Sequence, residues 1–257
     1  MITSPQNPKL KLIRALQGRA KARRKEKAFL VEGVRLLEEA IAAKWDIRFI
    51  LHDRSLSERG QELLQSLADI EIEKIDSALL KSVSDTENSQ GIIAVLDDSK
   101  IPIPDSPDFL LILDQIRDPG NLGTLLRTAA AAGVDAVILP PKTTDAFSPK
   151  VLRAGMGAHF HIPIISMNWK GIEKQVAGLT VFLAEMEGGV NYTEASLNQG
   201  CALIIGGEAE GASKSARELA QASIHIPMPG EMESLNAAVA GAILIFEVVR
   251  QRSRRIR

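Results

Sequence analysis

Short, almost continuously apolar runs recur along the second half of the chain, and segments with helical spacing of apolar residues separate them. The runs predict strands at residues 109–114, 136–140, 161–166, 180–186, 202–207 and 223–228. The segments between them predict helices around residues 121–132, 149–158, 170–177, 214–222 and 234–250. Apolar strands that alternate with helices are typical of a parallel sheet covered on both faces. The pattern therefore predicts a parallel α/β domain.

The first half has a different order of elements. Apolar residues at spacings of three and four predict a helix over residues 29–44, and a second helix is predicted over residues 59–69. Strands are predicted at residues 47–53, 70–75 and 91–97. This mixture predicts a small α/β domain that is separate from the parallel one.

A proline-rich stretch separates the two halves. Residues 101–107 read IPIPDSP and hold three prolines. Proline fixes φ, removes a hydrogen-bond donor and disfavours helix in the residue before it, so this stretch indicates a linker. We therefore predict a first domain at 1–97, a linker at 98–107 and a second domain at 108–257.

The net charge of −1 conceals an uneven distribution of charge. Residues 1–30 hold nine lysines and arginines against one acid, and residues 250–257 hold five arginines and no acid. Residues 31–249 hold 17 basic and 31 acidic residues. A basic segment on an acidic body favours a nucleic-acid partner, because phosphate contacts dominate nucleic-acid affinity. The alternative, a solvated helix face and a frayed tail, stays open.

The composition is that of an ordinary globular protein, with 45% hydrophobic and 25% charged residues. The longest apolar stretch, residues 235–246, falls well short of the roughly 18 to 20 residues that a membrane span needs. The first residues, MITSPQNPKL, lack the apolar core of a secretion signal. Cys201 is the only cysteine, so no internal disulfide is possible. We expect a cytoplasmic protein that does not span a membrane.

The segment DPGNLGTLLRT, residues 118–128, follows the first predicted strand of the second half. Asn121 is expected to cap the helix, and Arg127 flanks a polar stripe on it. Ligands of open parallel sheets bind outside the carboxyl ends of the strands, where an arginine fork holds a phosphate with two hydrogen bonds. Arg127 is therefore a candidate phosphate ligand, although a solvated polar face explains the same stripe.

Two further strand ends combine glycine or proline with polar residues. The segment IIGGEAEGAS, residues 204–213, places Glu208 beside glycines that allow close backbone approach, but it differs from the phosphate-binding pattern G-x-x-x-x-G-K-[ST]. In the segment IPMPGEMESLNAAVAGAIL, residues 226–244, Ser234 is expected to cap the last helix. Asn236 is expected to be a buried amide that needs partners. A tight turn with exposed acids and a satisfied core asparagine remain possible structural explanations.

Together, the three segments resemble the motifs of the SpoU (TrmH-like) family of RNA 2′-O-ribose methyltransferases, in the SPOUT superfamily. The first family motif, N-x-G-x-x-x-R-T, matches Asn121, Gly123, Arg127 and Thr128. The second, G-x-E-x-x-G-x-S, matches Gly206, Glu208, Gly211 and Ser213. The third, I-P-M-x-G followed by S-L-N, matches Ile226, Pro227, Met228, Gly230, Ser234, Leu235 and Asn236. The first half, with FLVEG at 29–33, resembles the L30e-like substrate-binding domain of many members.

The resemblance implies a catalytic domain with a trefoil knot, which binds S-adenosylmethionine, forms a homodimer and methylates a ribose 2′-hydroxyl of RNA without a metal. It implies a catalytic set of Asn121, Arg127, Glu208, Ser234 and Asn236. It implies that the methyl donor, S-adenosylmethionine, is contacted by Gly206, Gly207, Ile226, Met228, Leu235 and Ala238. The basic helix of the L30e-like domain is expected to bind RNA through Arg19, Arg23, Arg24 and Lys25. Because guanidinium stays protonated in proteins, Arg127 fits a phosphate clamp better than a general base.

Ribosomal RNA is the expected substrate, and transfer RNA is the alternative. A non-catalytic RNA-binding protein on the same scaffold is a second alternative, although such a protein has no evident need for the whole catalytic set. A doubly wound nucleotide-dependent enzyme is disfavoured, because DPGNLG rather than G-x-G-x-x-G follows the first strand. None of the four histidines lies in the three motifs, so no metal site is expected.

Overall fold

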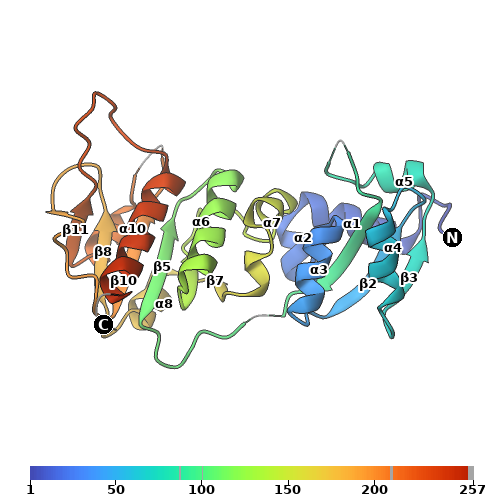
Figure 1. Ribbon diagram of the computed structural model, residues 1–257, viewed down its shortest axis with the longest axis horizontal. Coiled ribbons are helices and arrows are strands. Elements are labelled where there is room, and N and C mark those ends of the chain that lie inside the picture. The colour runs from blue at the N-terminus through green and yellow to red at the C-terminus, as the bar shows by residue number, and fades with distance from the viewer. Residues whose placement is uncertain (87, 100, 209–210, 254–257) are drawn as a thin grey trace. The chain divides into compact units, whose positions relative to one another are not determined.

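The computed structural model describes residues 1–253 except 87, 100, 209 and 210. The chain forms two compact units, which Figure 1 shows with their helices and strands. Unit 1 consists of Met1–Ser99 and Phe147–Phe160, and unit 2 consists of Lys100–Ala146 and His161–Arg257. The second half of the chain thus contributes one segment to the first unit.

In the described part of unit 1, a four-stranded sheet has the order β1-β4-β2-β3. Its strands are β1 (Ala28–Glu32), β2 (Ile47–His52), β3 (Ile72–Lys74) and β4 (Ile92–Asp97). β4 runs antiparallel to β1 and β2, whereas β2 and β3 are parallel. The helices are α1 (Pro8–Gly18), α2 (Ala20–Glu26), α3 (Val34–Ala42), α4 (Glu58–Gln65), α5 (Ser77–Lys81) and α7 (Pro149–Gly155), with a 3₁₀ helix at Ala158–Phe160. This is the small α/β unit that the first half predicts.

The helix predicted over residues 29–44 is wrong at its start. The residues from Phe29 to Glu32 form most of β1, and α3 begins only at Val34. Gly33 separates the two elements with a φ of 99°, a conformation that favours glycine. The apolar residues of β1 are buried and pair with β4, so they serve a sheet although their spacing also fits a helix.

The segment Phe147–Phe160, predicted as part of the second domain, packs within unit 1. The ring centroid of Phe29 lies 5.0 Å from that of Phe147 and 6.4 Å from that of Phe160. Trp45 meets Phe160 edge-on at 5.3 Å. Because aromatic side chains bury large apolar areas, these contacts explain why the segment joins unit 1.

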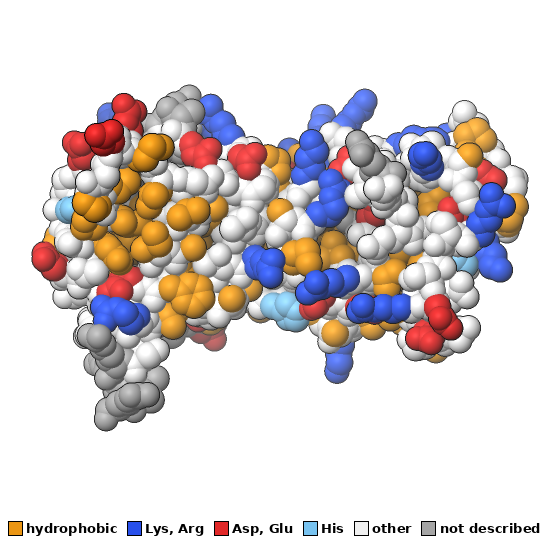
Figure 2. Space-filling model, turned by 45° about the horizontal axis from the view of Figure 1, so that its top comes forward, with side chains coloured by type: hydrophobic (Ala, Val, Ile, Leu, Met, Phe, Trp, Pro, Cys, Tyr) orange, Lys and Arg blue, Asp and Glu red, His pale blue; other side chains and the backbone are white. Residues whose placement is uncertain are grey.

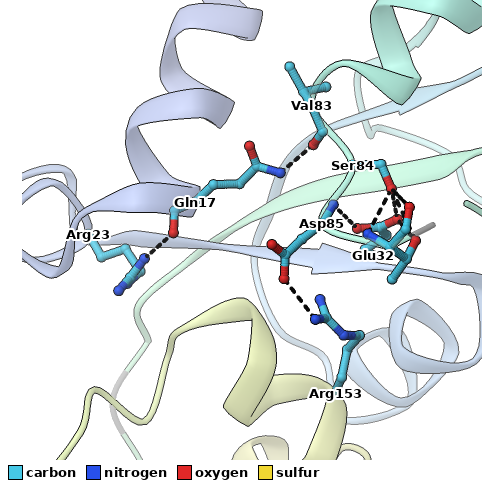
Figure 3. Close-up of polar contacts among 8 residues, drawn as sticks. Gln17, Arg23, Glu32, Val83, Ser84, Asp85 and Arg153 are labelled. Carbon is cyan, nitrogen blue, oxygen red and sulfur yellow. Dashed lines mark hydrogen bonds and ion pairs between the residues drawn. The ribbon is translucent and has the colours of Figure 1, made fainter. Parts of the chain in front are cut away.

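Polar contacts also link separate segments of unit 1 (Figure 3). The hydroxyl of Ser84 donates to the carboxylate of Glu32, and the backbone N–H of Asp85 donates to its second oxygen at 3.0 Å. Arg153 of α7 donates to the carboxylate of Asp85 at 2.7 Å. The segment before β4 is thereby held to β1 on one side and to α7 on the other.

Arg23 corrects the predicted RNA-binding set. Its side chain is buried, and its guanidinium donates to the carbonyl oxygens of Leu16 and Gln17 at the end of α1. Figure 3 shows the contact with Gln17. The last carbonyls of a helix lack partners within the helix. Arg23 therefore stabilises the corner between α1 and α2 and is not available to a phosphate. The other three predicted residues, Arg19, Arg24 and Lys25, are exposed.

The described arginines of the basic tail also have partners within the protein. Arg250 forms an ion pair with the buried carboxylate of Glu247 at 2.5 Å. Arg252 pairs with Asp108 at 2.8 Å and lies over the ring of Phe109. Residues 254–257 lie outside the described residues, so the predicted polyanion contact of the tail has no support from Arg250 or Arg252.

In the described part of unit 2, a seven-stranded sheet has the order β7-β6-β5-β10-β8-β11-β9, and every neighbouring pair is parallel. The strands are β5 (Phe109–Asp114), β6 (Ala136–Leu139), β7 (Ile164–Ser166), β8 (Thr180–Ala184), β9 (Val190–Asn191), β10 (Cys201–Gly206) and β11 (Ala222–His225). The predicted parallel α/β domain is confirmed. β9 was not predicted, because two residues are too few for a repeating pattern.

Helices cover both faces of this sheet. They are α6 (Pro119–Ala132), α8 (Trp169–Gln175), α9 (Lys214–Leu219) and α10 (Ala237–Ser253). α6 and α10 pack side by side on one face (Figure 1), whereas Ile172 of α8 and Ala216 of α9 belong to the apolar core on the other. Among the described residues, no helix is long and apolar enough to cross a membrane.

Candidate active site

Four neighbouring strands of unit 2, in the order β5-β10-β8-β11, end at one edge of the sheet. Gly206 at the end of β10 pairs with Asp114 at the end of β5, and Ala184 at the end of β8 pairs with Ile224 on β11. The loops that carry the three sequence motifs follow β5, β10 and β11. They therefore start at the edge where open α/β sheets bind their ligands.

Three of the five predicted catalytic residues form one hydrogen-bonded network. The side-chain amide of Asn121 donates to Oε1 of Glu208. The side-chain amide of Asn236 donates to the same Oε1 atom and to Oδ1 of Asn121, both at 3.0 Å. Glu208 is 87 residues from Asn121 and 28 residues from Asn236 in sequence. One carboxylate thus joins the loop after β10 to α6 and to the start of α10.

The structure corrects two predicted helix caps. Asp118 rather than Asn121 caps α6, and its carboxylate accepts from the backbone N–H of Asn121 at 2.8 Å. Asn236 rather than Ser234 caps α10, because its Oδ1 accepts from the backbone of the first turn at 2.9 Å. Asn236 is also exposed, not buried as predicted. These start points leave the amide groups of both asparagines available to Glu208.

Arg127 lies in the second half of α6 on its exposed face, outside the network. Within the described part of the chain, its guanidinium has no hydrogen-bond or ion-pair partner. The hydroxyls of Thr124 and Thr128 donate to backbone carbonyls one turn earlier, so they form no ligand network of their own. Helical side chains tilt toward the N-terminus, which for Arg127 is the end of α6 that carries Asn121.

A cavity of about 410 Å³ adjoins the network and includes Glu208 in its wall. Its lining contains five of the six predicted donor contacts, namely Gly206, Gly207, Ile226, Met228 and Leu235. The sixth, Ala238, is buried and is not part of the lining. Ser234 lines this cavity instead of joining the network. We call this space the donor cavity, because most of the predicted contacts of the methyl donor line it.

A smaller cavity of about 90 Å³ shares Gly207 and Glu208 with the donor cavity. Asn121 and Arg117 also line it. Glu208 therefore borders both cavities, whereas Asn121 lines only the smaller one.

The donor cavity depends on the absence of side chains at two glycines. A Cβ atom on Gly206 would lie 2.7 Å from the backbone nitrogen of Ala212, and one on Gly207 would lie 2.4 Å from the carbonyl oxygen of Gln115. Backbone therefore forms this wall at close range. Pockets for small molecules have volumes of roughly 300–1,000 Å³ and a mostly apolar lining with few polar groups. The donor cavity fits this description, and it suits a ligand with an aromatic base, hydroxyls and a charge.

Sequence reasoning missed two charged residues of the donor cavity. Glu185 and Arg217 both line it and form an ion pair at 3.0 Å. Glu185 follows directly after the strand β8, but the predicted strand at 180–186 contained it, so its place at a strand end was not evident from the sequence. Arg217 lies on α9, and no local pattern distinguishes it from a solvated helical arginine.

Figure 2 shows a broad hydrophobic area on the exposed face of unit 2, with acidic side chains along part of its border. The exposed large hydrophobic residues of unit 2 are Met186, Val190, Met232, Leu235, Val239 and Phe246. Two of them, Met186 and Leu235, line the donor cavity. The other four do not line it.

Cys201 lies at the first residue of β10, at the opposite end of the strand from the network. Burial raises the pKa of its thiol to about 11, so the thiolate is not available at neutral pH. Within residues 1–253, apart from those not described, no group of three or more His, Cys, Asp and Glu side chains is arranged to hold a metal ion.

Two family models match the chain. Residues 108–246 match the model of the SpoU rRNA Methylase family, and residues 7–94 match that of the MRM3-like substrate binding domain. The first match contains all three motif segments and the whole network. The second lies within unit 1.

Individual relatives match over almost the whole chain. The 23S rRNA (guanosine(2553)-2′-O)-methyltransferase of Bacillus subtilis is 36% identical, over 96% of this chain and 98% of its own length. The 23S rRNA (uridine(2479)-2′-O)-methyltransferase of Streptomyces viridochromogenes is 32% identical, over 98% and 92%. The crystal structure of the SpoU methyltransferase AviRb from that species, in complex with AdoMet, has a TM-score of 0.85 at 29% identity and covers 96% of this chain and 100% of its own. The motifs, the fold and both halves of the chain match. The chain therefore belongs to the SpoU rRNA methylase family.

Proposed function

We propose that this protein transfers a methyl group from S-adenosylmethionine to a ribose 2′-hydroxyl of ribosomal RNA. The observation that carries the proposal is the joining of Asn121, Glu208 and Asn236 at the rim of a donor-sized cavity. Three segments that follow separate strands of the parallel sheet supply these residues. The two relatives named above are 23S rRNA 2′-O-methyltransferases, which favours ribosomal over transfer RNA.

The donor cavity would hold S-adenosylmethionine against Gly206, Ile226 and Leu235, with backbone groups contacting the adenine. When bound, this cofactor supplies an electrophilic methyl group on its sulfonium. Glu208 holds the two asparagines in place and keeps the rim of the cavity polar. Arg127 binds a phosphate of the RNA and so orients the ribose, a positioning effect that lowers the barrier by several kcal/mol.

Methyl transfer to defined RNAs tests the proposal. The full chain is incubated with isotopically labelled S-adenosylmethionine and either unmodified large-subunit ribosomal RNA or transfer RNA, and 2′-O-methylation is mapped. Label at one ribose of ribosomal RNA is the expected result. Label in transfer RNA would support the alternative substrate, and donor or RNA binding without label would support the non-catalytic alternative.

We also propose that unit 1 selects the RNA through Arg19, Arg24 and Lys25. These side chains are exposed on the α1–α2 segment, whereas the side chain of Arg23 is hydrogen-bonded to a backbone carbonyl oxygen. Residues 1–97 would then be the substrate-binding domain and residues 108–257 the catalytic domain, joined by the linker 98–107. The packing of Phe147–Phe160 within unit 1 means that residues 1–97 cannot be removed without exposing its aromatic rings.

Charge reversal tests this assignment in the full chain. The double variant Arg24→Glu/Lys25→Glu is expected to bind RNA at least about 10-fold more weakly, and its salt dependence should fall by about two ion equivalents, because each lost phosphate contact removes about one. Lys170→Glu/Lys174→Glu, on exposed positions of α8 in unit 2, is the matched control. Equal losses in both variants would contradict a specific role for unit 1.

We also propose that the protein forms a homodimer through the exposed face of α10. Val239 and Phe246 are each 49% exposed and lie seven residues apart, so they share one face of the helix. A second copy of the chain would bury this face. Light scattering should give twice the chain mass for the unmodified protein and for Val190→Glu, and the single chain mass for Phe246→Glu. A monomeric unmodified protein would contradict the dimer.

The trefoil knot of the family and a cytoplasmic location complete the proposal, and the bacterial 23S rRNA relatives support the location. Small residues support the knot, since a chain that passes through a loop needs little bulk. A Cβ atom on Gly241 of α10 would lie 2.4 Å from Cδ2 of Leu125 on α6. The two helices therefore approach closely at this point.

A further inference from the structure

Glu185 occupies the middle of the edge where the donor cavity lies. β8 is the central strand of the β10-β8-β11 part of the sheet, and Glu185 is the residue that follows it. Gly206 ends the neighbouring strand on one side, and Ile226 follows the neighbouring strand on the other. Because the three strands are parallel, Glu185 must emerge between these two backbone corners of the cavity.

The carboxylate of Glu185 is held in place by α9. Nε of Arg217 donates to Oε1 of Glu185 at 3.0 Å, and Nη1 of Arg217 donates to the carbonyl oxygen of Ala212 at 2.7 Å. The side chain of Glu185 is only 24% exposed. Both charged residues line the donor cavity. Arg217 thus positions a partly buried carboxylate in the lining of the cavity.

The other carboxylate of the cavity, that of Glu208, already accepts from two asparagine amides. Glu185 is the carboxylate of the cavity lining that lies outside this network. Its charge is offset by Arg217, so it suits neutral hydroxyl donors better than a cationic group. A carboxylate at the carboxyl end of a parallel strand accepts ribose hydroxyls in dinucleotide-binding sheets, by the same geometry.

We propose that Glu185 binds the vicinal hydroxyls of the donor's ribose, with Arg217 as its positioning residue. The inference rests on the proposed function, because it assumes that the cavity takes S-adenosylmethionine. It adds a side chain to a site in which the sequence motifs supply mainly backbone. It also predicts that the ribose hydroxyls contribute to donor selection.

Calorimetry with the full chain tests the proposal without reference to catalysis. Glu185→Gln keeps the size of the side chain and removes its charge. This variant is expected to bind S-adenosylhomocysteine about 10- to 100-fold more weakly than the unmodified protein, as hydrogen bonds to a charged group contribute. For the 2′,3′-dideoxy analogue of S-adenosylhomocysteine, the two proteins should differ by less than about 3-fold, since no diol is present.

Glu187→Gln is the matched control, because Glu187 is exposed two residues further along and is not part of the cavity lining. It should bind both ligands as the unmodified protein does. Equal losses for Glu185→Gln with both ligands would overturn the proposal, as would an unchanged affinity for S-adenosylhomocysteine. A larger loss for S-adenosylmethionine than for S-adenosylhomocysteine would assign Glu185 to the sulfonium instead and overturn it too. If the unmodified protein binds neither, the proposed function itself fails.

Discussion

Replacing Arg127 with alanine is expected to reduce methyl transfer about a thousand-fold, while the affinity for S-adenosylhomocysteine changes by less than about two-fold. The side chain lies outside the donor cavity, so its removal leaves the donor contacts intact. Its guanidinium is exposed and, among the described residues, unpaired, so it is available to a phosphate. Single-turnover kinetics with saturating donor measures the effect directly.

Arg127→Lys provides the matched comparison. A lysine keeps the charge but cannot hold a phosphate with two parallel hydrogen bonds, so we expect an intermediate rate. The unfolding midpoint should not change in either variant, because Arg127 has no described partner within the chain. Full turnover by the alanine variant would remove Arg127 from the mechanism.

Replacing Gly207 with alanine is the second change with a large expected effect. Its new methyl group would lie 2.4 Å from the carbonyl oxygen of Gln115, and that oxygen is backbone, which cannot rotate away. The loop after β10 must therefore shift, and with it Glu208. Overpacking of this kind costs about 1–3 kcal/mol of stability. Because the shifted loop forms part of the cavity wall, we expect the affinity for S-adenosylmethionine to fall about 10- to 100-fold.

Gly230→Ala is the matched control for this experiment. Gly230 lies in the third motif, and a Cβ atom there would have no heavy atom within 4 Å. Titration calorimetry should therefore find its donor affinity unchanged. A normal affinity in Gly207→Ala would show that the loop after β10 does not need close approach to the residue after β5.

Most strands of unit 2 were predictable because a strand buried on both faces leaves an almost continuous apolar run. The run at 109–114 coincides with β5, whose six residues are all buried. The same signal failed at 29–44, where the apolar residues of β1 and α3 are contiguous and only Gly33 divides them. Charge was a weaker guide, since Arg23 looks like its exposed neighbours in sequence but is buried against the end of α1.

The motifs indicated most of the donor cavity, because glycine and proline at strand ends are local signals. They did not indicate that Ser234 lines the cavity while Asn236 caps α10, since cap choice depends on where the helix meets its neighbours. They also missed Glu185, because the predicted strand at 180–186 contained it, whereas β8 ends one residue before it. Its significance comes from the position of β8 between β10 and β11.

The sequence by itself determined which segments would be buried, where most strands of unit 2 would lie and which segments after them would carry glycine, amide and carboxylate groups. Only the tertiary structure decided which of those segments meet. Glu208 joins Asn121 and Asn236 across 87 and 28 residues because β10 lies beside β5, and Phe147–Phe160 leaves its own half of the chain to pack in unit 1. Periodicity reports whether a residue faces the core or the solvent, but the order of strands in a sheet depends on contacts between residues far apart in the chain.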